Sequence, residues 1–317
     1  MQWIKLDDNS ITDDLFHQLV DLEINCGLEP FTPEMLWCCI NEMDTFAWMD
    51  GNTIAGFITV QPYIGYFGGG LYIVNLNVGI PYRRQGLGSS LMLTALAHYG
   101  YSHQGRTVSL DVVKTNAAAL NLYKKLGFHI TDFPSENGPS DYVMIVELDK
   151  LLGTCVTDRL ALRPVIPENA VTLRRLLTDD SVKETYMVPD LDETATSQLV
   201  NHIIRLSYDP KRYVRGVYQE DYLIGLLNDV EIINDRIELG WLIAPTEQNK
   251  GYATEVLKAA LDDLFSKGFR CVTAGAFAEN KASIRVMEKA GMQLTQRREE
   301  IEYRGKTHHC LYFERCQ

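Results

Sequence analysis

The sequence lacks any long apolar run. No stretch reaches the ~18 residues that a membrane-spanning helix needs, although 46% of the 317 residues are hydrophobic. The first residues, Met1–Asp8, contain no basic flank followed by an apolar segment, which a secretory signal would have. We therefore expect a cytoplasmic protein with no membrane partner.

Cysteines in a metal-binding or disulfide pattern are also missing. The seven cysteines are odd in number and include no Cys-x-x-Cys pair, which argues against a disulfide framework and against a zinc site. We expect no bound metal and reduced thiols that pack mostly in the core. The seven are Cys26, Cys38, Cys39, Cys155, Cys271, Cys310 and Cys316.

Positive charge is scarce. The net charge is −12, and residues 1–150 hold 8 basic against 17 acidic side chains, whereas residues 151–317 hold 22 against 25. A nucleic-acid partner is not expected, because its phosphates require a basic face. A negative field does attract a cationic amine, although a merely solvated acidic surface has the same composition.

What the sequence does have is an internal repeat. Arg83–Gly88 follows the apolar run Leu71–Val78, and Gln248–Ala253 follows the apolar run Ile237–Ile243. Both runs predict a strand that enters a glycine-containing loop.

A second repeated segment follows each loop. Asn116–Phe128 and Asn280–Met292 both begin with Asn and reach a Gly 11 residues later, and the offset between the copies is 164 or 165 throughout. We infer a duplicated domain, with one copy in residues 1–150 and the other in residues 151–317.

The predicted elements repeat in the same order. The first copy has a strand, two helices, a hairpin, the strand before the loop, a helix from the loop to about Tyr101, a strand, a short helix and two more strands. The ranges are Trp3–Leu6, Thr12–Glu23, Thr32–Met43, Phe46–Trp48, Thr53–Gln61, Leu71–Val78, Arg106–Val112, Asn116–Lys125, Phe128–Thr131 and Tyr142–Leu148. The second copy runs from Arg159 to Phe313, with helices over 167–177 and 193–208 and paired strands over 213–218 and 222–232.

The loops suit a diphosphate. A strand that enters a glycine loop and then a helix leaves backbone N–H groups unpaired at the positive end of the helix dipole. Glycine at 86, 88 and 251 lets the backbone approach an anion, and Arg83, Arg84 and Lys250 add charge. A dinucleotide fingerprint would need Gly where Leu91 stands, and a Walker loop would need Gly-Lys-Ser/Thr. A glycine pair also starts many helices that bind no ligand.

The second segments decide between these alternatives. Arg83–Gly88 and Gln248–Ala253 match the coenzyme A loop of the GNAT superfamily of N-acetyltransferases, and Asn116–Phe128 and Asn280–Met292 resemble the Asn-led helix that follows it there. The resemblance implies an α/β (α+β) fold in which each copy has a mixed, mostly antiparallel central sheet flanked by helices. Arg159–Pro164 and the strand that begins at Glu238 are similar to the branch that acetylates the N-termini of ribosomal proteins.

The resemblance also implies acetyl-CoA as cofactor and assigns residues to it. A bulged strand before each loop would offer backbone N–H groups at Asn77–Gly79 and Leu242–Ala244. The cofactor residues so implied are Asn77, Val78, Arg83, Arg84, Gln85, Gly86, Leu87, Gly88, Ser89 and Asn116 in the first copy, and Leu242, Ile243, Gln248, Asn249, Lys250, Gly251, Tyr252, Ala253, Thr254 and Asn280 in the second. Asn116 and Asn280 would in addition cap their helices.

An acid must protonate the departing thiolate. Tyr123 matches the family's tyrosine, although its spacing from Leu120 and Leu126 also fits a core residue. The second copy has Met287 there, which carries no proton to donate, and Ser283 one turn earlier is a possible substitute.

A base must accept the proton of the attacking ammonium ion. Glu238 stands in the strand where the family often carries Glu, and an ordinary strand carboxylate would look the same. The first copy has only Asn75 and Asn77 there, which could hold a water, so Glu23 or Asp111 would have to serve from elsewhere.

These residues predict an acetyl-CoA-dependent N-acetyltransferase that acts by direct attack of an amine. The acceptor is a small-molecule amine or a peptide N-terminus. The incomplete acid–base sets leave a second hypothesis open, an acetyl-CoA sensor or scaffold without turnover. The tandem would be a monomer with an intramolecular pseudo-dimer, or a homodimer.

Because each copy has its own loop, we predict two coenzyme A sites per chain. Isothermal titration calorimetry with coenzyme A measures the stoichiometry directly. A stoichiometry of one would mean that one copy is a scaffold.

Overall fold

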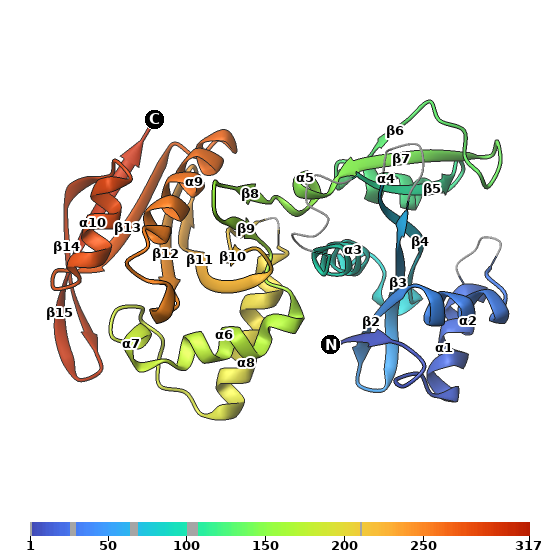
Figure 1. Ribbon diagram of the computed structural model, residues 1–317, viewed down its shortest axis with the longest axis horizontal. Helices are drawn as coiled ribbons and strands as arrows, with labels where there is room; N and C mark the ends of the chain where they lie inside the picture. The colour runs from blue at the N-terminus through green and yellow to red at the C-terminus, as the bar shows by residue number, and fades with distance from the viewer. Residues whose placement is uncertain (1, 26–29, 64–68, 100–106, 210) are drawn as a thin grey trace. The chain divides into compact units, whose positions relative to one another are not determined.

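The computed structural model describes residues 2–25, 30–63, 69–99, 107–209 and 211–317. The chain divides into two compact units, Met1–Gly153 and Thr154–Gln317, which are described separately below (Figure 1). The division lies three residues beyond the boundary expected from the repeat. No helix among the described residues is long and apolar enough to cross a membrane.

In unit 1 the described residues form a seven-stranded sheet in the order β1-β2-β3-β4-β5-β7-β6. Only the β4–β5 pair is parallel. The elements are β1 (Gln2–Leu6), α1 (Asp13–Ile24), α2 (Pro33–Glu42), β2 (Asp44–Asp50), β3 (Thr53–Tyr63), β4 (Gly70–Val78), a 3-10 turn (Ile80–Tyr82), α3 (Leu87–Ala97), β5 (Thr107–Val113), α4 (Ala117–Lys125), β6 (His129–Ile130), β7 (Asp141–Glu147) and α5 (Leu148–Leu152).

Unit 2 repeats the plan with an eight-stranded sheet among its described residues, in the order β14-β15-β13-β12-β11-β10-β9-β8. Its one parallel pair is β12–β13. The elements are β8 (Cys155–Val156), β9 (Ala161–Arg163), a 3-10 turn (Pro167–Asn169), α6 (Ala170–Thr178), α7 (Asp180–Lys183), α8 (Glu193–Ser207), β10 (Arg215–Gln219), β11 (Tyr222–Ile233), β12 (Arg236–Ile243), a 3-10 turn (Pro245–Glu247), α9 (Tyr252–Ser266), β13 (Cys271–Phe277), α10 (Lys281–Lys289), β14 (Gln293–Tyr303) and β15 (Lys306–Cys316).

The expected fold class is confirmed in both units: a mixed, mostly antiparallel sheet flanked by helices. The helix expected to reach Tyr101 ends at Ala97, and residues 100–106 lie outside the described part of the chain. Helices α5 and α7 were not anticipated from the sequence, because four or five residues are too few to show a helical period.

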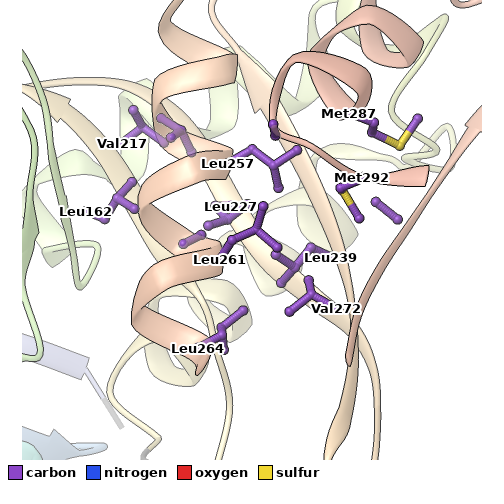
Figure 2. Packing of buried hydrophobic residues seen from close by; sticks show 14 of the residues in the cluster. Leu162, Val217, Leu227, Leu239, Leu257, Leu261, Leu264, Val272, Met287 and Met292 are labelled. Carbon is purple, nitrogen blue, oxygen red and sulfur yellow. The ribbon is translucent and has the colours of Figure 1, made fainter. Parts of the chain in front are cut away.

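Helices cover both faces of the unit 2 sheet, because neighbouring strand residues enter different cores. Val217 and Leu227 pack with the α9 residues Leu257 and Leu261, whereas Tyr218 next to Val217 packs with α6 and α8. Figure 2 shows the first of these clusters, in which the side chains of α9 lie against the sheet. Successive side chains of a strand point to opposite faces, so each strand serves two cores.

The parallel pair in each unit is hydrogen-bonded over only half of the length of its first strand. We call the unpaired half, where the two strands separate, the splay. In unit 1, β4 pairs with β5 from Gly70 to Ile73 and then continues to Val78 without that partner. In unit 2, β12 pairs with β13 from Arg236 to Leu239 and then continues to Ile243. The splay leaves one edge of each strand with backbone groups that β5 or β13 does not satisfy. Each splay opens at the strand end that leads into the glycine loop.

The expectation of reduced thiols is wrong for two cysteines. Cys271 and Cys316 form a disulfide, and they stand directly opposite each other in the antiparallel β13–β15 register. They are 45 residues apart in sequence, so no spacing rule could pair them. Cys38, Cys39, Cys155 and Cys310 are free thiols, two of them buried. Cys26 lies outside the described residues.

We predict that Cys316→Ser destabilises unit 2 selectively. A disulfide that closes a loop of this length contributes about 2–4 kcal/mol to the free energy of unfolding. Under non-reducing conditions, scanning calorimetry of the full chain should show one of two transitions shifted to lower temperature. Cys38→Ser is the matched control in unit 1, and equal transition temperatures for parent and C316S would contradict the prediction.

Candidate acyl-transfer sites

The two glycine loops share one backbone conformation. Gly86 and Gly251 have φ of +83° and +84°, and Arg84 and Asn249, two residues earlier, have φ of +62° and +61°. Glycine is required at the first pair, because a side chain there would hold a strained left-handed conformation. Positive φ at Arg84 and Asn249 is uncommon for non-glycine residues. The two loops therefore have the same backbone geometry at all four positions.

Each loop delivers unpaired donors at a helix start. Among the described residues, no acceptor is found for the backbone N–H groups of Leu87, Gly88 and Ser89 in α3, or for those of Tyr252, Ala253 and Thr254 in α9. These three consecutive groups, with the helix dipole, suit an anion such as a diphosphate. The space is also tight: a Cβ on Gly88 would lie 3.3 Å from Leu122 of α4.

The first side chain of each loop hydrogen-bonds back to the preceding strand. Arg83 Nε donates to the carbonyl oxygen of Val78 at 2.8 Å, and Gln248 Nε2 donates to that of Ile243 at 3.1 Å. Both carbonyls belong to the last residue of the strand, so Arg83 and Gln248 fix how the strand turns into the loop. Gln85 makes a similar bond to Pro81 at 2.8 Å.

The basic side chains expected to add charge at the loops differ in their surroundings. Lys250 is paired with Glu247 at 2.8 Å, so its charge is partly neutralised. Arg159 is a second cation at this loop that the sequence did not point to. Its Nη1 bonds the Lys250 carbonyl at 3.0 Å and its guanidinium lies 4.6 Å from the Tyr252 ring centre, but its charge is likewise partly neutralised by Glu255 at 2.6 Å. Arg84 of the first loop is exposed.

The splayed strands present backbone donors. Gly79 N–H donates to Ala55 at 2.9 Å and Ala244 N–H donates to Ile224 at 2.7 Å, so these two point to the neighbouring antiparallel strand. The backbone N–H groups of successive strand residues point to alternate sides. The N–H groups of Val78 and Ile243 therefore point toward the splay. Asn77 and Leu242 face the antiparallel partner with Gly79 and Ala244. Of the strand residues expected to offer N–H groups to a cofactor, only Val78 and Ile243 have the required direction.

The expected bulge in the strand before the loop occurs only in unit 1. There Thr59 pairs with Asn75 and Val60 with Ile73, so Val74 is the extra residue of β4. In unit 2, Asp229 pairs with Leu239 and Glu231 with Glu238, which places the extra residue on the neighbouring strand β11. The expectation for unit 2 is therefore corrected. A bulge in either strand shifts the register by one residue and bends the pair.

A cavity of about 430 Å³ opens beside the splay of unit 2. Glu238 of β12, Phe277 of β13, and Asn280 and Ser283 of α10 line it, so residues far apart in sequence meet there. The opposite wall is apolar and comes from α6, the segment after α7, and α8. That wall includes Leu177, Met187, Val188, Leu199, Ile203 and Leu206.

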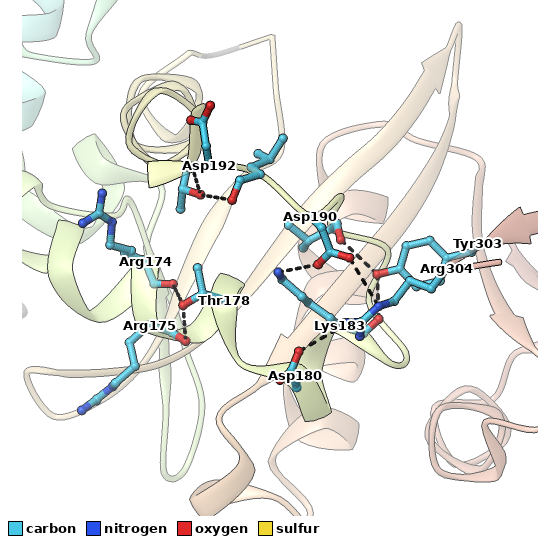
Figure 3. A network of polar contacts seen from close by, with 12 residues as sticks. Arg174, Arg175, Thr178, Asp180, Lys183, Asp190, Asp192, Tyr303 and Arg304 are labelled. Carbon is cyan, nitrogen blue, oxygen red and sulfur yellow. Dashed lines mark hydrogen bonds and ion pairs between the residues drawn. The ribbon is translucent and has the colours of Figure 1, made fainter. Parts of the chain in front are cut away.

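A hairpin holds this apolar wall in place, as Figure 3 shows. The Tyr303 hydroxyl at the tip of β14 lies 2.7 Å from the Lys183 carbonyl oxygen and 3.0 Å from that of Val188. Lys183 pairs with Asp190 at 2.8 Å, and Arg304 lies 3.6 Å from the same carboxylate. The segment 184–189 is thus fixed at both ends.

Comparison with known proteins identifies both units. A model described as "Acetyltransferase (GNAT) family" matches residues 14–128, and one described as "Acetyltransferase (GNAT) domain" matches residues 159–293. YkkB of Bacillus subtilis (strain 168), described as an uncharacterized protein, is 33% identical over 150 residues, which are 44% of this chain and 86% of YkkB. The chain belongs to the GNAT acetyltransferase family.

The chain is also similar to three further proteins. The uncharacterized N-acetyltransferase YoaA of the same bacterium is 28% identical over 143 residues, which are 43% of this chain and 81% of YoaA. A GNAT-family acetyltransferase from Bacillus anthracis is 23% identical, with a TM-score of 0.46 and coverage of 51% of this chain and 98% of that one. RimL, a ribosomal L7/L12 α-N-protein acetyltransferase solved with coenzyme A, is 19% identical, with a TM-score of 0.47 and coverage of 51% and 97%.

Within the first GNAT domain, Tyr123 lies in α4, which starts after the end of β5. Asn116 caps α4 by accepting from Ala119 N–H at 3.1 Å, as expected. The Tyr123 ring packs against Phe128, and the side chain is only 8% exposed. Burial raises the pKa of Tyr123 to about 12, so the phenol stays protonated at neutral pH. Among the described residues its hydroxyl has no hydrogen-bond partner.

The second GNAT domain uses the equivalent helix differently. Met287 is fully buried and belongs to the α9 core, so it takes no part in chemistry (Figure 2). Asn280 caps α10 by accepting from Ser283 N–H at 3.0 Å, and its Nδ2 donates to Ser283 Oγ at 3.0 Å. The Ser283 hydroxyl hydrogen remains free to point into the cavity, which Ser283 lines.

Glu238 has features of both alternatives that the sequence left open, a general base and an ordinary ion-paired strand carboxylate. It lines the cavity, and it forms an ion pair with Arg297 of β14 at 2.9 Å. Burial raises the pKa of the Glu238 carboxyl above its ordinary value, and the hydrogen bond and charge of Arg297 oppose that rise. Arg297 in turn bonds Glu299 at 2.8 Å and stacks 3.7 Å from the Tyr312 ring centre.

The structure adds site residues that the sequence did not reveal. Tyr186 of the cavity wall donates to Asn228 at 2.5 Å, and Cys310 and Tyr312 line the floor. They lie in the early loops and late strands, which carry no repeated pattern. Arg297 shows no signal either, because an isolated Arg on an exposed strand looks the same as any surface charge.

Proposed function

We propose that the chain is an N-acetyltransferase that moves the acetyl group of acetyl-CoA to a primary amine by direct attack. The acceptor is a small molecule or a peptide N-terminus. One observation carries the proposal: in unit 2 a carboxylate of raised pKa, Glu238, and a hydroxyl, Ser283, line one cavity at the mouth of the β12–β13 splay. A base and an acid then line the same cavity, which acyl transfer requires.

The residues present fit coenzyme A. The unaccepted N–H groups of 87–89 and 252–254 would hold the diphosphate. Val78 and Ile243 would offer N–H groups to the pantetheine arm or to the thioester carbonyl, where a positioned donor stabilises the developing negative charge. When bound, acetyl-CoA supplies the acetyl group as a reactive thioester.

The side chains of unit 2 divide the proton transfers. Glu238 takes a proton from the ammonium ion, which frees the lone pair of the amine for attack. Its raised pKa brings it closer to the neutral range in which a base works best. Ser283, which lines the same cavity, would protonate the departing sulfur, and Tyr123 would have that role in unit 1.

The apolar wall of the unit 2 cavity favours an acceptor with an apolar body beside its amine. The resemblance of Arg159–Pro164 and of the β12 sequence to ribosomal-protein acetyltransferases favours a peptide N-terminus over a free amino acid. A peptide amine also needs an open route, which the cavity beside β12 supplies.

We predict that Arg297→Gln moves the acidic limb of the unit 2 rate to higher pH. Arg297 lowers the pKa of Glu238, so its loss raises that pKa further and the base stays protonated up to a higher pH. A pH profile of kcat/KM with a peptide acceptor measures the limb. Glu238→Gln should remove the limb altogether, and a profile identical in R297Q and parent would contradict the role of Glu238.

We predict that Tyr123→Phe lowers kcat of the unit 1 reaction by about 100-fold, the usual contribution of a general acid. The effect should be largest below the pKa of the thiolate, where protonation of the leaving group matters most. Steady-state kinetics in the Glu238→Gln background measure it, with Tyr142→Phe as the control. An unchanged kcat would remove Tyr123 as the acid.

A panel of amines and peptides separates this proposal from its alternative, an acetyl-CoA-binding sensor or scaffold. Any transfer above the solution background supports the enzyme. Coenzyme A binding without turnover across the whole panel would support the sensor.

A further inference from the structure

Unit 1 contains a buried carboxylate with no cation beside it. Glu23, in the last turn of α1, is 3% exposed. Among the described residues, no Lys or Arg forms an ion pair with it. Asn75 and Asn77 of β4 donate to its Oε1 at 2.6 and 2.5 Å, and the Phe31 N–H donates to Oε2 at 3.2 Å. A buried charge is costly unless it is paired, so three neutral donors leave this group in need of a cation.

A second buried polar group, which has no hydrogen-bond partner among the described residues, lies beside Glu23. Asn75 is 8% exposed, and its carbonyl oxygen has no donor. A carboxylate only accepts hydrogen bonds, so the NH2 of Asn75 must face Glu23 and the oxygen must point elsewhere. A buried acceptor without a donor costs free energy. A ligand that brought several N–H groups would satisfy both Asn75 and Glu23.

The cluster adjoins the strand that is expected to hold the cofactor arm. Asn75 and Asn77 alternate along β4 with Leu76 and Val78, whose N–H groups face the splay. Asn77 directly precedes Val78 and is half-buried. The bulge at Val74 immediately precedes the cluster.

Unit 2 shows what this position is used for. Counted back from the two loop glycines, Asn75 corresponds to Gly240. Gly240 lines the unit 2 cavity, and a Cβ on it would lie 3.6 Å from Tyr186. The strand position that bonds Glu23 in unit 1 is thus cavity wall in unit 2. Glu238 has no acidic counterpart on β4, and Glu23 reaches the same face of the sheet from a helix.

We propose that Glu23, oriented by Asn75 and Asn77, binds the ammonium group of the acceptor in unit 1 and accepts its proton. The binding half stands without the proposed function, whereas the proton transfer rests on it. The ligand class is a primary ammonium ion. Asn75 Oδ1 and the Glu23 carboxylate would accept its N–H groups.

The proton balance is complete. One proton passes from the ammonium nitrogen to Glu23, the nitrogen–carbon bond forms, and the carbon–sulfur bond breaks with its electron pair on sulfur. Tyr123 protonates the sulfur, and the second proton lost by the nitrogen restores Tyr123. Glu23 then releases its proton to solvent. The products are an N-acetylamine, a thiol and one proton.

The surroundings of Glu23 suit a base. Burial raises the pKa of its carboxyl, and the bonds from Phe31, Asn75 and Asn77 oppose the rise. The titratable group that faces it from α2 is Cys39, whose thiol pKa burial raises to about 11, so this neighbour stays neutral. Arg83, a cation close to the end of α1, donates to the Asn25 carbonyl at 3.2 Å and, within the described part of the chain, forms no ion pair with Glu23.

Asp111, the other carboxylate considered for unit 1, has a structural task. It accepts from Ser135 Oγ and, at 3.0 Å, from Asn137 Nδ2, and so ties down the loop before β7. Burial raises its pKa as well, and Asp141 and Glu136 add repulsion. Its donors belong to a surface loop, and no orphaned buried acceptor adjoins it among the described residues.

Binding of n-butylamine to the full chain with coenzyme A present, followed by NMR titration at pH 7, tests the site. Glu23→Gln should weaken binding at least about tenfold, the cost of losing a charge-assisted bond. Asp21→Asn, which removes an exposed carboxylate of the same helix, should leave binding unchanged. Equal affinity in E23Q and parent overturns the proposal. Retained coenzyme A binding verifies that the variant is folded.

Acetylation of n-butylamine in the Glu238→Gln background tests the proton transfer. E23Q should lower kcat by about 100-fold at pH 7 and recover at alkaline pH, where the free amine needs no base. Asn77→Ala, a milder change at a half-buried position, should move the acidic limb to higher pH because a bond that lowers the pKa of Glu23 is lost. An unmoved limb overturns the base role. A third result is that n-butylamine binding depends on Glu23 but the parent transfers no acetyl group. That result would support the ammonium site and would contradict both the base role of Glu23 and the proposed function of unit 1.

Discussion

The incomplete parallel pairing between β4 and β5, and between β12 and β13, is the constraint on which the rest of the structure depends. Backbone groups of a strand must be satisfied or face water or a ligand. Ending the ladder at Ile73 and at Leu239 frees one edge of each strand just before the glycine loop. The glycine loop follows directly on that edge, so the proposed sites depend on one departure from regular pairing.

Duplication has kept the backbone and changed the side chains. Both loops retain positive φ at equivalent positions, and both Asn-led helices keep their caps. The chemistry diverges around this frame. In the proposed sites, unit 1 has Tyr123 and a carboxylate from helix α1, whereas unit 2 has a carboxylate from β12 and a core methionine at the position of the tyrosine. Backbone geometry tolerates little change, because it is fixed by hydrogen bonds on both sides. The side chains lining a pocket face no such constraint.

The same distinction explains how far the sequence could predict the structure. Glycine loops, Asn caps and apolar strands are local signals, so the fold class, the two copies and the helix caps follow from spacing. Glu23 and Asn75 meet across 52 residues, and Cys271 and Cys316 across 45. Such contacts depend on strand register, which no local pattern specifies. The position of the bulge in unit 2 escaped prediction for the same reason, since one extra residue in β11 or in β12 bends the pair equally well.

The central claim is that the splayed strand edges bind the acyl-carrying arm of the cofactor. Amide hydrogen exchange, with and without acetyl-CoA, tests it residue by residue. The account predicts that bound acetyl-CoA slows exchange at Val78 and Ile243, whose N–H groups face the splay, and leaves Leu242 unchanged because it pairs with β11. Protection confined to the glycine loops, with no change at the two strand amides, would contradict it.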